Sequence, residues 1–201
     1  MSARGVLING NKGTGNYQNK DALDKLVKYV CRVNRDDKDL IDCIGFGVDN
    51  EADLSDQIDM MNMIQRINGI EKRGGKRAEQ LIFSIKEDQF RQFGCNPQLV
   101  AKAFREMGAT IYEDGYQVYV GSHYNPPCDD KEKSFMHAHY IINSINYCTG
   151  WKFRKSHEEK YIMQDNFDQI LDKYQQMSPV TFSNLDAFIQ TDPQYCSLYE
   201  R

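Results

Sequence analysis

Three of the four histidines lie close together in the sequence, and their spacing suits a metal site. His137 and His139 are two residues apart in a stretch rich in strand-forming residues. Because side chains alternate along a β-strand, both imidazoles are expected on the same face. His123 ends the preceding predicted strand and adds a third nitrogen if the two strands pair. Three imidazoles leave open positions on an ion, as catalytic metal sites do. The alternative is a set of ordinary exposed or core histidines.

The histidines belong to a chain in which predicted strands and helices alternate. Apolar and β-branched runs predict strands at Val6–Ile8, Ile44–Val48, Leu81–Ile85, Tyr116–Val120 and Met136–Asn143. Helical periodicity predicts helices at about Lys20–Val33, Asp53–Ile67, Asn96–Gly108 and Glu158–Tyr174. Asn146–Gly150 is expected to turn into a hairpin with Trp151–Arg154. This order fits an α+β fold, a mainly antiparallel central sheet with helices packed on one face.

Length and composition favour one soluble domain. The chain has 201 residues, is 40% hydrophobic and carries a net charge of -4. We expect one domain over residues 1–178, followed by a tail or the start of another region over 179–201. No apolar run reaches the ~18 residues of a membrane span, so we expect a cytoplasmic protein with no membrane partner. The six scattered cysteines are expected to be reduced thiols.

Basic side chains cluster in two segments, although the total charge is negative. One group comprises Lys72, Arg73, Lys76 and Arg77, and the other comprises Lys152 and Arg154 beside the single tryptophan, Trp151. Lysine and arginine suit contacts with backbone phosphates, and an exposed tryptophan can stack on a base. We expect the second group to hold a DNA strand beside the histidines. The alternative is solvated charge and a core tryptophan.

The segment His137–Phe153, HAHYIINSINYCTGWKF, resembles a known signature. It is similar to that of the relaxases of plasmids and conjugative elements, mobilisation nucleases of the HUH class. Their pattern is His-x-His, a hydrophobic pair, Asn-Ser or Asn-Arg, and then Thr-Gly-Lys. Ala78–Ile85 and Gly45–Gly47 also have counterparts in that family, and the resemblance covers about Leu7–Leu171. It implies a single HUH relaxase-like domain of palm or RRM type.

The resemblance also implies a metal and its ligands. In that family three histidines bind one divalent ion, which assigns His123, His137 and His139 as the ligands. The family uses Mg²⁺ or Mn²⁺ as cofactor. Imidazole ligands by themselves favour Mn²⁺, Zn²⁺ or Ni²⁺ over Mg²⁺, so Zn²⁺ or Ni²⁺ in a crystal would be compatible with the site.

The nucleophile that the resemblance implies is a tyrosine of the first helix, and Tyr29 matches that position. Helical geometry places Tyr29 at the flank of the apolar stripe rather than at its centre. Lys25 and Arg32 are its neighbours on the helix, where they would favour the phenolate and seat the DNA. Tyr17, in the glycine-rich segment before the helix, is the alternative nucleophile.

The implied reaction nicks one strand of single-stranded or hairpin DNA at an origin of transfer. It leaves a 5′-phosphotyrosyl link and a free 3′-hydroxyl, and its reversal rejoins the strand. Accessory relaxosome and coupling proteins are the implied further partners. The alternatives are a rolling-circle replication initiator of the same chemistry, a non-catalytic DNA-binding module that keeps the fold, and a hydrolase in which a metal-bound water attacks.

The chain departs from the family pattern between the histidines. Asn125 stands where relatives have an aspartate beside the first histidine. Asp129 or Asp130, in the longer segment that follows, is the expected replacement, unless that function is absent. Gln80 stands where many relatives have a histidine, and we do not expect it to be catalytic.

Overall fold

The computed structural model describes residues 5–9, 17–33, 39–70, 74–124, 136–154 and 156–177. Five strands form one sheet: β1 (Val6–Asn9), β2 (Leu40–Phe46), β3 (Ala78–Ile85), β4 (Tyr116–Tyr124) and β5 (Met136–Asn146). The helices are α1 (Ala22–Val30), α2 (Leu54–Ile67), α4 (Glu87–Gln92), α5 (Pro97–Glu113) and α6 (His157–Gln176). Lys72, Arg73, Asn125, Asp129, Asp130 and the predicted tail lie outside the described residues.

The sheet has the strand order β1-β3-β5-β4-β2, and every neighbouring pair is antiparallel. The predicted α+β class with a mainly antiparallel sheet is therefore confirmed. β5 lies at the centre, between β3 and β4. The strand that carries two of the histidines is thus fixed by hydrogen bonds along both of its edges.

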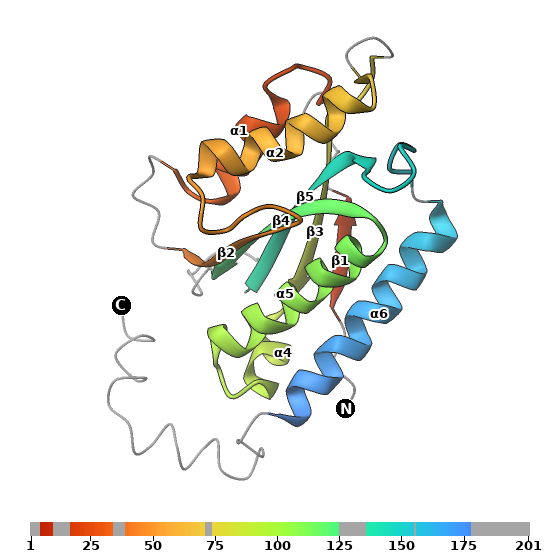
Figure 1. The fold of residues 1–201 in the computed structure, drawn as a ribbon. Coiled ribbons are helices and arrows are strands. Elements are labelled where there is room, and N and C mark those ends of the chain that lie inside the picture. Colours follow the sequence, from red (N-terminus) through yellow and green to blue (C-terminus); the bar gives the residue numbers. More distant parts are fainter. Residues whose placement is uncertain are drawn as a thin grey trace.

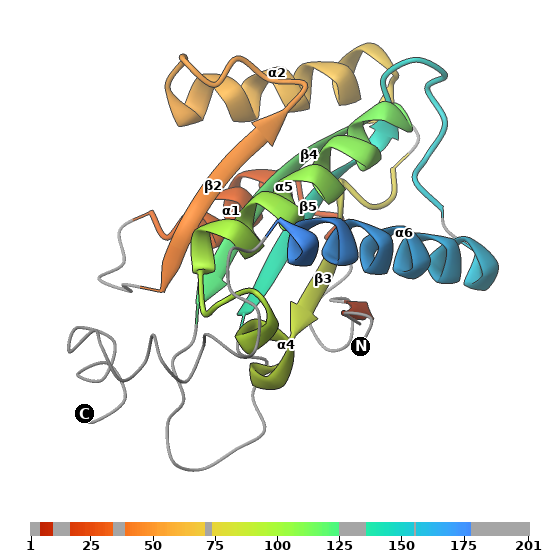
Figure 2. The ribbon, with the colours of Figure 1, turned by 90° about the horizontal axis from the view of Figure 1, so that it is seen from below.

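Helices cover both faces of the sheet, so the prediction that they pack on one face is wrong. Figure 1 shows α1 and α2 on one side and α4, α5 and α6 on the other, and Figure 2 shows the second group from below. Alternate residues of β5 explain this arrangement. Tyr140 and Ile142 pack in the larger core with α5 and α6, whereas Ile141 packs in the smaller core under α1 and α2. A strand with apolar side chains on both faces needs cover on both.

The helix starts follow local sequence signals. Asn96 caps α5 by accepting a hydrogen bond from the Leu99 amide at 3.1 Å, and Pro97 occupies the first turn. Ser156 and Glu159 form a reciprocal capping box at the start of α6. α5 continues past Gly108 to Glu113, so the predicted stop is wrong. A Cβ on Gly108 would lie 2.6 Å from Val120 Cγ2, which indicates that this glycine permits close helix–sheet packing.

The predicted hairpin after β5 is present. Ile145 and Lys152 form a bridge, and the Phe153 amide donates a hydrogen bond to the Ser144 carbonyl at 2.8 Å.

Among the described residues, every helix is too short or too polar to cross a membrane.

Cys31 and Cys43 form a disulfide, so the prediction that all cysteines are reduced is wrong. Cys31 is the residue after α1, and Cys43 lies in β2, with their Cα atoms 5.8 Å apart. Packing of α1 over the edge of the sheet brings the two together, which twelve residues of sequence separation do not reveal. Cys148 is a free thiol. The bond ties the end of α1 to β2.

Candidate active site

The three predicted metal ligands lie together on the sheet face covered by α1 and α2. His123 of β4 stands directly opposite His137 of β5, and His139 stands opposite Gly121. The His123 and His137 rings are stacked with centroids 5.3 Å apart. The His139 ring lies edge-on to both, at 5.3 Å from His123 and 5.0 Å from His137. Strand pairing thus brings together three imidazoles that the sequence separates.

The environment favours neutral imidazoles, which is the form that binds a metal ion. Burial lowers the pKa of His137 to about 4 and that of His139 to about 3, with the neighbouring histidines adding to the shift. Burial also lowers the pKa of His123, whose side chain is completely buried. At neutral pH each ring therefore carries a proton on one nitrogen and a lone pair on the other.

Two ring nitrogens of the cluster and the spacing of its rings bear on metal binding. Nε2 of His123 and Nδ1 of His137 are buried and have no hydrogen-bond partner, an arrangement that usually has a specific reason. An imidazole bound at about 2.1 Å has its centroid about 3.2 Å from the ion, so ligands at about 90 to 110° have centroids about 4.5 to 5.2 Å apart. The observed spacings are close to this range. Among the described residues, however, no group of three or more His, Cys, Asp or Glu side chains is placed so that it could hold a metal ion.

Two further side chains contact the histidine cluster. Oδ2 of Asp39 lies 3.2 Å from Nδ1 of His123. Nε2 of Gln80 lies 2.8 Å from Nδ1 of His139, and the Tyr17 hydroxyl donates to Oε1 of Gln80 at 2.9 Å. Nothing in the sequence marks Asp39 as part of the site, because it lies in an acidic run far from the histidines. Gln80 stands out in the sequence only as a departure from the family pattern.

Tyr29 lies over the same cluster. Its ring stands edge-on to His139 at 5.9 Å between centroids, and 40% of the residue is exposed. α1 reaches this position because the strand beneath it carries a glycine. A Cβ on Gly121 would lie 2.7 Å from the Val30 carbonyl oxygen. The helix therefore rests directly on β4, with Tyr29 at the border between the buried histidines and solvent.

The two predicted cationic neighbours of Tyr29 are both paired with carboxylates. Lys25 forms an ion pair with Asp21 at 2.6 Å and is well exposed. The Arg32 side chain is only 10% exposed and pairs with Asp39, while its guanidinium carbon lies 5.2 Å from the centroid of the Tyr29 ring. Arg32 is thus an internal part of the site rather than a surface cation.

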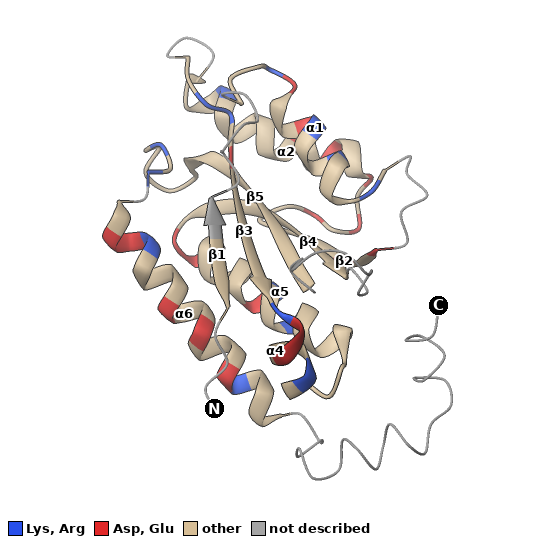
Figure 3. Cartoon of the chain, turned by 180° about the vertical axis from the view of Figure 1, so that it is seen from behind, with Lys and Arg blue, Asp and Glu red and all other residues tan. Residues whose placement is uncertain are grey.

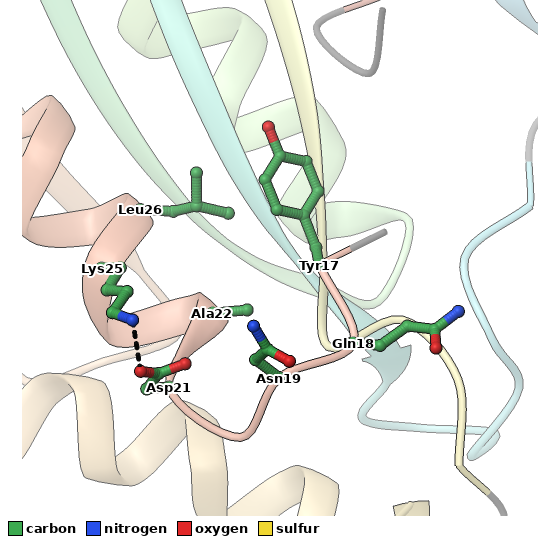
Figure 4. Close-up of a pocket in the computed structure, with 7 residues that line it drawn as sticks. All are labelled: Tyr17, Gln18, Asn19, Asp21, Ala22, Lys25 and Leu26. Atoms are coloured by element: carbon green, nitrogen blue, oxygen red, sulfur yellow. Dashed lines mark ion pairs between the residues drawn. The ribbon is translucent and has the colours of Figure 1, made fainter. Parts of the chain in front are cut away.

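A pocket of 310 Å³ opens beside this site at the start of α1. Figure 4 shows Tyr17 along one side and the Lys25–Asp21 ion pair on the other. The remaining lining residues are Gln18, Asn19, Ala22 and Leu26. The alternative nucleophile, Tyr17, therefore lies between the pocket and the Gln80–His139 contact.

The other predicted DNA-binding residues lie elsewhere. β5 begins at the histidines and ends seven residues beyond His139, a rise of about 23 Å. Trp151 and Lys152 lie beside this far end, where the Asn146 amide donates to the Trp151 carbonyl and Lys152 pairs with Ile145. The expected DNA contact of this segment stays a prediction. Figure 3 shows basic residues near this end of the sheet, where β3 begins. The Lys152 ammonium donates to the Gly74 carbonyl at 2.6 Å, which joins the two predicted basic segments.

The members of this basic surface differ in exposure. Trp151 is 76% exposed, and Arg154 is exposed as well. Lys76 pairs with Glu79 at 2.9 Å. Arg77 is only 8% exposed, and its guanidinium contacts Gln65, so it is placed inside the domain rather than on a DNA-facing surface.

Asn143, the asparagine of the His-x-His signature, has a structural role. Asn143 is fully buried, and its amide donates to the Met61 carbonyl at 2.8 Å and to Gln117 at 2.9 Å. Its oxygen accepts from Gln65 at 3.0 Å. These contacts connect α2 to the central strands and so fix the layer that covers the histidine face.

Comparison with known proteins agrees with this geometry. The family model described as "Relaxase: MobA/VirD2-like, nuclease domain" matches residues 14–176, which include all three clustered histidines and Tyr29. No curated protein matches the chain, and no solved structure matches it. Since the family model spans most of the chain, the protein belongs to the MobA/VirD2-like relaxases through their nuclease domain.

Proposed function

We propose that this relaxase domain nicks and rejoins one DNA strand at an origin of transfer by attack of Tyr29. The observation that carries the proposal is the position of Tyr29. Its partly exposed ring stands against His139, at the border of a cluster of three histidines whose pKa values are lowered by burial. A DNA strand can reach the phenol from solvent while its phosphate faces the cluster.

His123, His137 and His139 would hold the metal cofactor. A bound divalent cation would polarise the scissile phosphate and stabilise its developing charge. Mg²⁺ or Mn²⁺ is the ion expected for the family, and imidazole ligands favour Mn²⁺, Zn²⁺ or Ni²⁺ over Mg²⁺.

The chemical step exchanges one phosphodiester for another. The Tyr29 oxygen forms a bond to phosphorus as its phenolic proton leaves, and the bond from phosphorus to the 3′-oxygen breaks. The 3′-oxygen takes up a proton to become the free hydroxyl. Because the phosphotyrosyl link is itself a phosphodiester, the step needs no nucleotide cofactor and can reverse to rejoin the strand.

The DNA is proposed to lie along two parts of the surface. Near the histidines, Lys25 and Arg32 flank Tyr29, although each is also paired with a carboxylate. At the far end of β5, Trp151, Lys152 and Arg154 are placed to contact a single strand or hairpin, together with Lys72, Arg73 and Lys76 of the neighbouring segment. Accessory relaxosome and coupling proteins are the further partners that this function calls for.

An adduct assay tests the proposal. The protein is incubated with Mn²⁺ and a labelled single-stranded oligonucleotide that carries an origin sequence, and denaturing electrophoresis detects covalent protein–DNA. We expect an adduct with the parent and with Tyr17→Phe, and none with Tyr29→Phe.

The other outcomes assign the competing functions. Loss of the adduct in Tyr17→Phe alone would make Tyr17 the nucleophile. Cleavage without an adduct would indicate attack by metal-bound water. Binding of the oligonucleotide without cleavage, across a panel of origin sequences, would indicate a DNA-binding module.

A further inference from the structure

The pocket at the start of α1 lies one helical turn from Tyr29, the proposed nucleophile. Lys25 lines the pocket, and Tyr29 follows it four residues later on the same side of the helix, a rise of about 6 Å. A stretched single DNA strand advances by a similar distance from one nucleotide to the next. A strand whose phosphate reaches Tyr29 therefore brings a neighbouring nucleotide to the pocket. The volume of 310 Å³ is at the lower end of the range for small-molecule sites and suits one nucleotide.

One wall of the pocket is an aromatic ring that is held at both ends. The Arg77 amide donates to the Tyr17 carbonyl at 2.7 Å, and the Tyr17 hydroxyl donates to Oε1 of Gln80 at 2.9 Å. Tyr17 has a left-handed backbone with φ of 41°, which a tyrosine rarely adopts unless its surroundings impose it. Figure 4 shows the side chains of Ala22 and Leu26 across the pocket from this ring. A flat base can therefore stack on Tyr17 with apolar groups on its other side.

The polar edge of the pocket is the ion pair between Asp21 and Lys25, at 2.6 Å. The hydrogen bond from Lys25 lowers the pKa of Asp21, so the carboxylate is an anion that only accepts hydrogen bonds. Its two oxygens offer further lone pairs beside the one that Lys25 uses, and the ammonium has further N–H donors. Although Asp21 precedes α1, its side chain makes no capping hydrogen bond among the described residues. The pair therefore presents acceptors and donors side by side to an occupant of the pocket.

Guanine is the DNA base whose edge matches this pair. Its Watson–Crick edge carries two adjacent donors, N1–H and the N2 amine, next to the O6 acceptor. A carboxylate can accept from both donors while an ammonium donates to O6. Adenine, cytosine and thymine do not present two adjacent donors on this edge, so each would leave part of the ion pair unmatched. Bases of single strands are read on this edge because it is not used in pairing.

We propose that the pocket is a guanine-binding site in which Tyr17 stacks on the base, Asp21 accepts from N1–H and the N2 amine, and Lys25 donates to O6. The inference deepens the proposed function and rests on it, because the guanine belongs to the nucleotide next to the phosphate that Tyr29 attacks. Phosphate contacts seat a strand of any sequence, whereas contacts with base edges select the sequence. The pocket thereby contributes to the choice of the nick site.

Binding of short oligonucleotides tests the site separately from cleavage. The probes are fluorescein-labelled oligothymidylates whose central thymine is kept or replaced by guanine, adenine, cytosine or hypoxanthine, and anisotropy measures their affinity for the full chain. Phosphate contacts are the same in every probe. We expect guanine to be bound about 5- to 10-fold more tightly than thymine, adenine or cytosine, the lower part of the range for a two-pronged base contact because the ion pair is partly exposed. Hypoxanthine, which lacks the N2 amine, should lose part of this preference.

Asp24→Asn is the matched control for Asp21→Asn. Asp24 forms the same kind of ion pair on the same helix, with Lys28 at 2.7 Å, and neither residue lines the pocket. Both substitutions remove one negative charge near the start of α1, so they should alter phosphate contacts alike. We expect Asp21→Asn to lose the preference for guanine and Asp24→Asn to keep it.

Two substitutions of Tyr17 separate stacking from the hydroxyl contact. Tyr17→Ala should weaken binding of the guanine probe about fivefold or more, whereas Tyr17→Phe, which keeps the ring, should retain most of the affinity. Equal affinities of the parent for all probes would overturn the inference. A preference that survives in Asp21→Asn, or that disappears equally in Asp24→Asn, would overturn it as well. The adduct assay judges the proposed function independently: a parent that prefers guanine but forms no adduct keeps the base site and loses the nicking reaction.

Discussion

The Tyr29 ring stands edge-on to the His139 ring, with their planes at 82° and their centroids 5.9 Å apart. Tyr29 belongs to α1 and His139 to the central strand, so the distance between them depends on how closely the helix rests on the sheet. The glycine of β4 beneath the end of α1 sets that approach.

Gly121→Ala should therefore change the position of α1 over the histidine cluster. The new methyl carbon would lie 2.7 Å from the Val30 carbonyl oxygen, and the end of α1 must lift to relieve the clash. We expect the free energy of unfolding to fall by about 1 to 3 kcal/mol. We also expect adduct formation per folded molecule to fall severalfold, measured by urea unfolding and the adduct assay.

Gly108→Ala is the control for this variant. Its methyl carbon would meet Val120 on the opposite face of β4, at 2.6 Å. It should destabilise the protein comparably and leave adduct formation per folded molecule unchanged. Equal losses of adduct in both variants would contradict the role assigned to Gly121.

Metal binding should stabilise the fold. An ion that binds only the native state at 100 times its Kd adds about 2.7 kcal/mol to the free energy of unfolding. We expect Mn²⁺ to raise the melting temperature of the parent and of His157→Ala, whose histidine lies on α6 away from the cluster. The rise should disappear in His137→Ala and in His139→Ala. A persistent rise in both would place the ion elsewhere.

Stability should fall as the pH is lowered below about 6.5. Burial lowers the pKa of His137 to about 4 and that of His139 to about 3. Between these values and the ordinary pKa of 6.5, the unfolded chain binds more protons than the native state. The free energy of unfolding therefore decreases as the pH falls through this window, which urea unfolding from pH 7 to pH 4 measures.

Asp39 also makes the free energy of unfolding decrease as the pH is lowered, but in a lower pH range. The hydrogen bond from Arg32 lowers the pKa of Asp39 to about 2, so its contribution is present above 3.8 and is lost as the pH approaches 2. His137→Gln combined with His139→Gln should flatten the upper part of the curve only. An unchanged slope between pH 6.5 and 4 in that double variant would contradict the assignment.

Reduction of the disulfide should lower stability. The bond between Cys31 and Cys43 closes a short loop, and the loop-entropy model gives about 3 kcal/mol for a loop of this size. We expect dithiothreitol and Cys43→Ser each to reduce the free energy of unfolding by up to this amount. Cys148→Ser, which alters a free thiol, should leave the response to dithiothreitol intact. Mass spectrometry of a Cys31–Cys43 linked peptide checks the pairing.

Trp151 should contribute to DNA binding and hardly at all to stability. It is 76% exposed, so Trp151→Ala is expected to change the free energy of unfolding by no more than about 0.5 kcal/mol. Stacking on one base is worth about 1 to 3 kcal/mol, and we expect a corresponding loss of affinity for single-stranded DNA by fluorescence anisotropy.

The parent and a control variant complete this test. Since Trp151 is the single tryptophan, bound DNA should also quench the intrinsic fluorescence of the parent. Tyr161→Ala removes another exposed aromatic residue, on α6, and should keep the parent affinity. Full affinity in Trp151→Ala would exclude this end of the sheet from the DNA path.

The sequence by itself determined the local features of the site. Strand alternation placed His137 and His139 on one face, and helical periodicity placed Tyr29 at the flank of an apolar stripe rather than within it. The family signature pointed to the relaxases, which the match over residues 14–176 confirms. These features depend on residues that are close in the chain, because the period of a strand or helix determines on which face of the element a side chain lies.

Only the tertiary structure decided which elements meet. It covered the second face of the sheet, joined Cys31 to Cys43, placed Trp151 beside the far end of β5, and brought Asp39 rather than a neighbour of His123 to the cluster. Such contacts follow from strand order and helix packing between distant segments. A carboxylate in an acidic run has no local signal that marks it, because its partner is chosen by strand pairing across the sheet.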